Sequence, residues 1–383
     1  MHLAKIIMHH DRLTRPSRNG LVLSAPLFCA LLAGSLTTAG CAAATAKASS
    51  GAGGAGGDGA VTSTSGGGAG DVGGGTFGQG GTGSTGSTGS GGGQGVSAAY
   101  AHTDKTLFEF DPAKPSLTTK KVGDFDCIGG QGQASSMTDV AVDSQGDIWG
   151  ISSKSVYQLI IQGGAVHCAK TIPLATSGKV SFYGLTFAPV GVIDPGKEVL
   201  VAGNTDGELW AIDANGAVTQ HGTLGNVPAN DGQGHSYPAK NQGKRWELSG
   251  DIVFLANGGK PVAFATVRDC PSPPSTSGCS ATDTLLEIDA SKLAGAATQS
   301  VAKAVRGQIV ERPGCNDPSG GPYGSMYGIA AWDSKVYGFS HGGAIVEIDN
   351  VTGGACLVVT TKNLWDGAGV TTVAPVIAPP PPK

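Results

Sequence analysis

Two aspartates occupy equivalent positions in an apolar segment that recurs along the chain. The copies at 136–142 and 249–254 both begin with serine, and they carry Asp139 and Asp251. Other copies have glycine there: Gly184, Gly328 and Gly369. Paired carboxylates can serve as acid and base in glycoside hydrolysis, and carboxylate oxygens also bind calcium. Three interpretations stay open for this pair, namely a catalytic pair, a calcium site and the polar lining of a water-filled channel.

A long polar segment, residues 226–248, combines aromatic and basic side chains. It contains His235, Tyr237, Arg245 and Trp246. Exposed aromatic rings beside basic and amide side chains suit the recognition of sugars or peptides. We therefore predict ligand binding at these four residues, with the alternative that Trp246 packs beneath its own loop.

The cysteines beyond residue 100 predict a disulfide framework. They are six in number: Cys127, Cys168, Cys270, Cys279, Cys315 and Cys356. The first two and the last two are each separated by 41 residues, which indicates equivalent pairs in two repeats. We expect the bridges Cys127–Cys168 and Cys315–Cys356, with Cys270 and Cys279 closing a loop of their own. The sequence has no CxxC pair and no HxxxH, so we predict no metal site of the structural zinc type.

Short apolar segments bounded by turn residues indicate that strands position these side chains. One strand motif ends in aspartate and recurs at 107–111, 209–213, 285–289 and 345–349, with a degenerate copy at 156–160. The serine-initiated segment precedes it, one strand lies between them, and a fourth strand follows. The only helical candidate is 290–297.

Four strands per unit, at periods of roughly 40 to 60 residues, resemble a β-propeller. The resemblance covers residues 97–375 and implies an all-β ring, which we count as five blades. The first unit lacks an innermost strand, and residues 367–373 match that strand, so we predict that they close the ring. An open β-sandwich and a six-bladed ring are the alternatives. In a propeller the long insertions at 127–136, 226–248, 268–283 and 308–324 would share one face. Five-bladed glycosidases carry carboxylates on inner strands, which keeps a carbohydrate- or lactone-active hydrolase or lyase as an alternative.

The first 40 residues are typical of an export signal. Basic residues precede the apolar run 21–36, which is shorter than a membrane span requires. Residues 38–41, Thr-Ala-Gly-Cys, resemble the lipobox of bacterial lipoproteins, which implies cleavage before Cys41 and lipidation of that cysteine. Ala42 in place of aspartate then implies the outer membrane. A plain secretory or periplasmic signal and a permanent anchor helix are the alternatives.

Residues 41–96 form a glycine- and serine-rich tether, and 376–383 a proline-rich tail. The net charge of −4 gives no reason to expect nucleic-acid binding, which needs a basic patch. We expect a monomer anchored to the membrane by lipid, with no organic cofactor. The leading hypothesis is a binding module that binds a glycan or a protein on the face that carries the four long insertions. The alternatives are the enzyme above and a structural surface lipoprotein.

Overall fold

The computed structural model describes residues 99–114, 118–176, 180–256, 260–274 and 277–375. The predicted signal peptide, Cys41, the tether and the proline-rich tail lie outside the described residues.

The described chain forms five four-stranded antiparallel sheets, each running from an inner to an outer strand. The first blade contains β20 (Gly367–Gly369), β1 (Ala99–His102), β2 (Thr106–Phe110) and β3 (Thr119–Asp124). The second contains β4 (Asp139–Val142), β5 (Ile148–Ile151), β6 (Ser155–Gln162) and β7 (Ala165–Pro173). The third contains β8 (Phe182–Ala188), β9 (Val199–Asn204), β10 (Glu208–Ile212) and β11 (Val218–Thr223).

The fourth blade contains β12 (Glu247–Leu255), β13 (Val262–Arg268), β14 (Thr284–Ile288) and β15 (Ala302–Gln308). The fifth contains β16 (Met326–Trp332), β17 (Lys335–Ser340), β18 (Ala344–Asp349) and β19 (Ala355–Thr360). In the described residues the helical candidate at 290–297 is reduced to one 3₁₀ turn, Ala290–Lys292.

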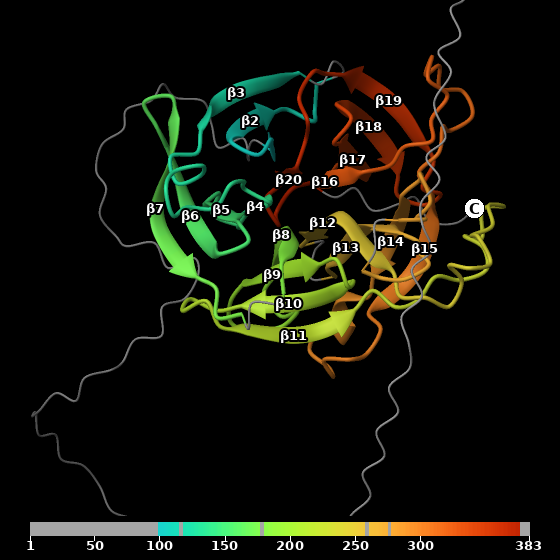
Figure 1. Ribbon diagram of the computed structural model, residues 1–383, viewed down its shortest axis with the longest axis horizontal. Helices are drawn as coiled ribbons and strands as arrows, with labels where there is room; N and C mark the ends of the chain where they lie inside the picture. Colours follow the sequence, from blue (N-terminus) through green and yellow to red (C-terminus); the bar gives the residue numbers. More distant parts are fainter. Residues whose placement is uncertain (1–98, 115–117, 177–179, 257–259, 275–276, 376–383) are drawn as a thin grey trace, which may run out of the picture. The chain divides into compact units, whose positions relative to one another are not determined.

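The blades form a closed ring, which confirms the predicted five-bladed propeller. Each innermost strand contacts the innermost strand of both neighbouring blades, in the order β4, β8, β12, β16, β20 and back to β4. Figure 1 shows these strands near the centre of the ring and the fourth strands at its rim. The ring closes where β20, from the end of the chain, pairs with β1, matching Tyr100 with Gly369. This pairing covers an edge that would otherwise be open to other chains.

Aspartate-led turns connect neighbouring strands within the blades. The Asp143 carboxylate accepts hydrogen bonds from the backbone N–H groups of Gln145 and Asp147, both at 2.9 Å. Gly146 supplies the left-handed conformation that this turn needs, with φ of 91°. The turn after β10 repeats the arrangement around Asp213. The aspartate that ends the strand motif is therefore the start of a tight turn.

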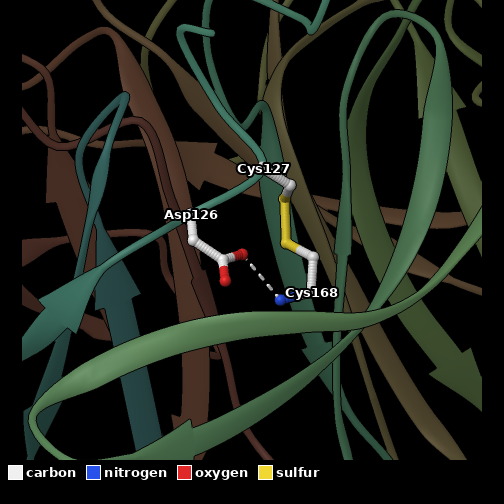
Figure 2. A group of neighbouring side chains, drawn as sticks. All are labelled: Asp126, Cys127 and Cys168. Carbon is white, nitrogen blue, oxygen red and sulfur yellow. Dashed lines mark hydrogen bonds between the residues drawn. A yellow bond between two sulfur atoms is a disulfide. The ribbon is translucent and has the colours of Figure 1, made fainter.

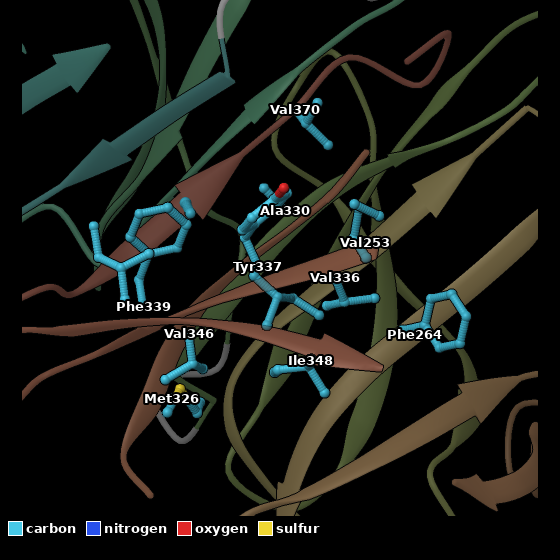
Figure 3. Close-up of a cluster of buried hydrophobic side chains, with 14 of the residues drawn as sticks. Val253, Phe264, Met326, Ala330, Val336, Tyr337, Phe339, Val346, Ile348 and Val370 are labelled. Atoms are coloured by element: carbon cyan, nitrogen blue, oxygen red, sulfur yellow. The ribbon is translucent and has the colours of Figure 1, made fainter. Parts of the chain in front are cut away.

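Apolar side chains fill the spaces between adjacent blades. One cluster joins the fourth, fifth and first blades, and Figure 3 shows part of it, with Val253 and Phe264 on either side of Val336. Trp365, which precedes β20, is fully buried in the same cluster. Each blade therefore covers the apolar face of the next one, and this burial is the main force that holds the ring together.

The inner strands approach one another too closely for ordinary side chains at some positions. A Cβ atom on Gly369 would lie 2.6 Å from the carbonyl oxygen of Val140 in the next blade. A Cβ on Gly250 would overlap the backbone of Tyr327. This crowding explains why glycine recurs in the inner-strand segment.

The end of the described chain crosses the ring rather than extending β20. Strand β20 covers only three of the predicted residues 367–373, because the next residues bond to other blades. The Thr371 hydroxyl donates to the carbonyl of Asp143 at 2.7 Å, and the Thr372 carbonyl accepts from the N–H of Ala256 at 2.6 Å. Further along, the Pro375 carbonyl accepts from the N–H of Asp333 at 2.7 Å. Residues 370–375 thus link the second, fourth and fifth blades and cover that end of the axis.

The three predicted disulfides are present: Cys127–Cys168, Cys270–Cys279 and Cys315–Cys356. Figure 2 shows the first, which ties the segment after β3 to β7 of the next blade. Asp126 strengthens this junction, because its carboxylate accepts from the N–H of Cys168 at 2.9 Å. Asp126 and the two sulfurs are close enough to hold a metal ion, but the disulfide occupies both sulfurs. No helix among the described residues is long and apolar enough to cross a membrane.

Candidate functional site

The two predicted channel aspartates lie on the ring axis and are completely buried, with exposures of 0%. The N–H of Leu185, in the third blade, donates to Asp139 at 2.5 Å. In the same way, the N–H of Ile329, in the fifth blade, donates to Asp251 at 2.8 Å. Each carboxyl group therefore joins its own inner strand to that of the following blade.

Asp139 and Asp251 lie close enough to interact electrostatically. Burial and then the Asp251 charge raise the pKa of Asp139 well above its usual range. Burial raises the pKa of Asp251 to about 8, against the opposing effect of its hydrogen bonds. His102 is buried beside them, with its Nε2 atom 3.6 Å from Oδ1 of Asp139, and burial lowers its pKa to about 4. Burial thus disfavours the charged forms of all three side chains on the axis.

The burial of Asp139 and Asp251 does not favour the catalytic alternative for this pair. Glycosidase carboxyl groups flank the scissile bond and stand about 5 Å or more apart. Here the two carboxyl groups have no exposed surface, so a sugar cannot reach them in the folded ring. The structure assigns them to the junctions between blades.

The predicted ligand-binding aromatics are also buried. Tyr237 is 2% exposed and Trp246 is 1% exposed, and their rings pack edge to face with centroids 5.2 Å apart. The Tyr237 hydroxyl lies 3.0 Å from the Thr284 hydroxyl, which satisfies it inside the protein. The alternative for Trp246 is therefore the observed one, because the ring supports the 226–248 loop from below and offers no face to a ligand.

The two polar members of the predicted set stay at the surface but do not form a cavity with the aromatics. His235 bonds to Asp231 at 2.7 Å, within the loop. Arg245 reaches Asp206 at 3.4 Å and Glu208 at 3.7 Å. These contacts stabilise the loop. The four predicted residues therefore contribute to the structure of the loop and do not form a common cavity.

The four long insertions lie on one face, as the strand order requires. Residues 127–136, 226–248 and 308–324 connect an outermost strand to the next innermost strand, and 268–283 connects β13 to β14. In an up-and-down blade, both kinds of connection leave the sheet at the same end. We call this the long-loop face.

A cavity of about 280 Å³ opens at the axis on the long-loop face, and we call it the funnel. All five blades contribute to its wall. The lining residues are Asp104, Ser136, Met137, Thr138, Tyr183, Thr205, Leu248, Ser249, Gly250, Arg268, Tyr327 and Asp366. Its size is at the small end of the range for ligand pockets in proteins. The funnel is the candidate functional site because side chains converge there from every blade.

One side of the funnel has a chain of interacting polar groups. His341 lies 3.0 Å from Asp366 through its Nδ1 atom, and its ring packs on Tyr327 with centroids 5.0 Å apart. Burial and then the charge of Asp104 raise the pKa of Asp366 to about 6.

The basic residue of the wall is already paired. Nε of Arg268 donates to Glu247 at 3.0 Å, and the Glu247 side chain is buried. The Arg268 charge also lowers the pKa of the buried Asp283, which burial itself raises to about 6. Ser249 bonds to Asp283 at 2.5 Å, which anchors this part of the wall. Arg268 is thus oriented by acidic groups beneath the funnel.

Part of the funnel wall corresponds to a repeated position in the sequence. Thr138, Tyr183 and Tyr327 each stand one residue before the axial position of the inner-strand segment. Aligning the repeated segments would have identified them as equivalent. Asp104 and Asp366 lie in short connections and are not part of any repeated motif, so only the folded ring shows that they belong to the funnel.

No protein-family model and no curated protein matches the sequence. Solved structures with similarity to the chain include the WD40 β-propeller domain of Doa1, with 11% identity and a TM-score of 0.32. That alignment covers 70% of this chain and 66% of the Doa1 chain, just under two thirds of its length.

Two bacterial structures show comparable similarity. A protein of unknown function from Bacteroides caccae has 11% identity and a TM-score of 0.34, with 71% of this chain and 97% of that one covered. Myxococcus xanthus glutaminyl cyclase has 14% identity and a TM-score of 0.29, with coverage of 62% and 71%. At these values the similarities assign no ligand and no activity to this chain.

Proposed function

We propose that this protein is an exported binding module that takes a small polar ligand into the funnel. The observation that carries the proposal is the convergence of all five blades on one open cavity. Its wall combines two tyrosines, hydroxyl groups and charged groups, which is the mixture of apolar contacts and oriented polar groups found in small-ligand sites.

The end of the axis opposite the funnel is closed, which favours a ligand-binding site over a channel through the ring. Residues 370–375 cross the ring there, and Asp139 and Asp251 fill the axis between the two ends. A ligand that enters the funnel must leave by the same opening. The buried state of Asp139 and Asp251 likewise favours a binding module over a hydrolase that uses them.

The test is thermal unfolding of the full chain with glucose, N-acetylglucosamine, glucosamine and putrescine as probes. A ligand at 100 times its dissociation constant stabilises the folded state by about 2.7 kcal/mol. We expect at least one probe to raise the melting temperature. If none does, a small-ligand function for these classes is rejected, and a protein partner on the long-loop face becomes the leading hypothesis.

A matched pair of variants locates the site. Thr205→Trp places a large ring in the funnel wall, whereas Thr219→Trp places the same ring on the exposed outer strand β11 of the same blade. The first variant is expected to abolish the shift and the second to keep it. Equal shifts in both variants would place the ligand elsewhere.

In the same proposal, a lipid on Cys41 anchors the module to the outer membrane and the tether extends it from the surface. The three disulfides support an oxidising, extracytoplasmic location. Two acyl chains are enough for stable anchoring. Growth with radiolabelled palmitate is expected to label the wild-type protein, and Cys41→Ser is expected to remain unlabelled. An unlabelled wild-type protein would favour the plain secretory signal.

A further inference from the structure

The funnel wall has an excess of negative charge. Two carboxyl groups line it, Asp104 from the β1–β2 turn and Asp366 from the segment before β20. Arg268 is the one basic residue among the lining residues, and it is paired with Glu247 at 3.0 Å. Its charge therefore does not offset that of the two aspartates.

The two aspartates line the same cavity and interact electrostatically. Burial and then the Asp104 charge raise the pKa of Asp366. Asp366 is mostly buried, with a side-chain exposure of 15%, and Asp104 is exposed. Two like charges in such a place are stabilised by a cation between them. His341 contacts Asp366 from the β17–β18 turn, but its ring also packs on Tyr327 and lies outside the lining of the cavity.

Aromatic side chains add a second attraction for a cation. Tyr327 and Tyr183 line the funnel from the fifth and third blades, and Tyr183 is 43% exposed. The electron-rich faces of aromatic rings attract ammonium groups. Hydroxyl groups of the wall, including Thr138 and Thr205, offer hydrogen bonds to the rest of a polar molecule.

From this charge and this lining, we propose that the funnel selects a small ligand with a protonated primary amine, which donates hydrogen bonds to Asp104 and Asp366. This inference rests on the proposed function and specifies the class of its ligand. A primary ammonium group has three N–H donors, so it can bond to both carboxylates at once. The volume of about 280 Å³ restricts the ligand to the size of an amino sugar or a short alkyl amine.

The test is isothermal titration of the full chain with two ammonium probes and their neutral counterparts. Glucosamine is compared with N-acetylglucosamine and glucose, which have the same ring but no charged amine, and putrescine tests the amine without a sugar. A hydrogen bond to a charged group is worth about 1.5–3 kcal/mol, so we expect glucosamine to bind at least about tenfold more tightly than N-acetylglucosamine.

Matched variants test the role of the carboxylates. Asp104→Asn removes one charge from an exposed position, and it is expected to weaken glucosamine and putrescine binding by about tenfold or more. Asp213→Asn removes a charge from an exposed turn after β10, outside the funnel, and is expected to leave binding unchanged. Asp366→Asn should act like Asp104→Asn, and the exposed Asp104 variant keeps the test valid if the Asp366 variant is unstable.

The pH dependence gives an independent readout with putrescine, which stays protonated across the range. Binding should strengthen between pH 5 and pH 7.5, because Asp366, with its pKa of about 6, ionises in this interval. Asp104 and His341 are the charged or titratable side chains that interact with Asp366.

The outcomes separate this inference from the proposed function. Tighter binding of the ammonium probes, lost in Asp104→Asn, supports both. Equal binding of neutral sugars and glucosamine, unaffected by Asp104→Asn but lost in Thr205→Trp, overturns the ammonium inference and leaves the binding function. The absence of binding by all four probes overturns both.

Discussion

Two sets of residues in this protein have similar side chains, but one set is enclosed in the protein and the other lines a cavity. The sealed set consists of Asp139, Asp251, Tyr237 and Trp246, all of them buried. The funnel set consists of Asp104, Asp366, Tyr183 and Tyr327, which line one open cavity. Each set has two aspartates and two aromatic residues.

The difference between the sets is access rather than chemistry. Burial raises the pKa of a carboxyl group in both sets, to about 8 at Asp251 and to about 6 at Asp366. At Asp251 the cause is complete enclosure and the bonds serve the ring, whereas Asp366 adjoins a space that a molecule can enter. A shifted pKa therefore marks a candidate site only where a ligand can reach the group.

The largest expected difference concerns the aromatic residues. Trp246→Ala should lower the free energy of unfolding by about 3–5 kcal/mol, because it removes a fully buried ring beneath the 226–248 loop. Tyr183→Ala, at an exposed position of the funnel, should change it by less than about 1 kcal/mol. Chemical denaturation measures both values. Similar losses in the two variants would contradict the division into a sealed and an open set.

A smaller effect is expected from crowding the sealed aspartates. A methyl group on Gly367 would overlap the Asp139 carboxyl group and the His102 ring. Gly367→Ala should therefore destabilise the protein by about 1–3 kcal/mol, as overpacked cores do. Gly196→Ala is the control, since its methyl group would meet Asp194 at an ordinary 3.6 Å. A neutral result at Gly367 under the same denaturation conditions would mean that the axis has unused space.

The smallest expected effect is a dependence of the free energy of unfolding on pH, caused by the sealed aspartates Asp139 and Asp251. Their folded-state pKa values are raised, so above pH 7 the folded state retains protons that the unfolded state, with a pKa of 3.8 for aspartate, has lost. Stability should then decrease as pH rises from 7 to 8, by up to about 1.4 kcal/mol per pH unit for each proton that the folded state retains.

Other shifted groups do not disturb this interval. Asp283 and Asp366, with pKa values of about 6, are ionised in both states there, and His102 is neutral in both. The double variant Asp139→Asn with Asp251→Asn removes both titrating groups and should flatten the curve between pH 7 and 8. A wild-type curve that is already flat would show that the pair holds no extra proton.

The sequence predicted most of the fold because the fold repeats. The strand motif that ends in aspartate, as at 107–111 and 345–349, requires both an apolar face and a tight turn, and these are local properties. The equal spacing of Cys127–Cys168 and Cys315–Cys356 set their register. The path of residues 370–375 was not predictable in this way, because their hydrogen bonds are made to several distant blades.

The site was predicted less well, and particular residues show why. Trp246 is a typical binding residue by type, but it directly precedes a strand that is buried along its whole length. Asp104 and Asp366 belong to short turns that resemble solvent-exposed connections. They are 262 positions apart in the printed sequence (366 − 104), and the pairing of β1 with β20 brings their turns together.

The sequence by itself determined the number of blades, the disulfide pairs and the face with the long loops, because each depends on local patterns that recur with the blade. The tertiary structure decided which aspartates and aromatics are enclosed and which are open. That choice depends on how closely five inner strands approach one axis, and on a C-terminal segment that covers one of its ends. Both are long-range consequences of ring closure, and no local stretch of sequence contains them.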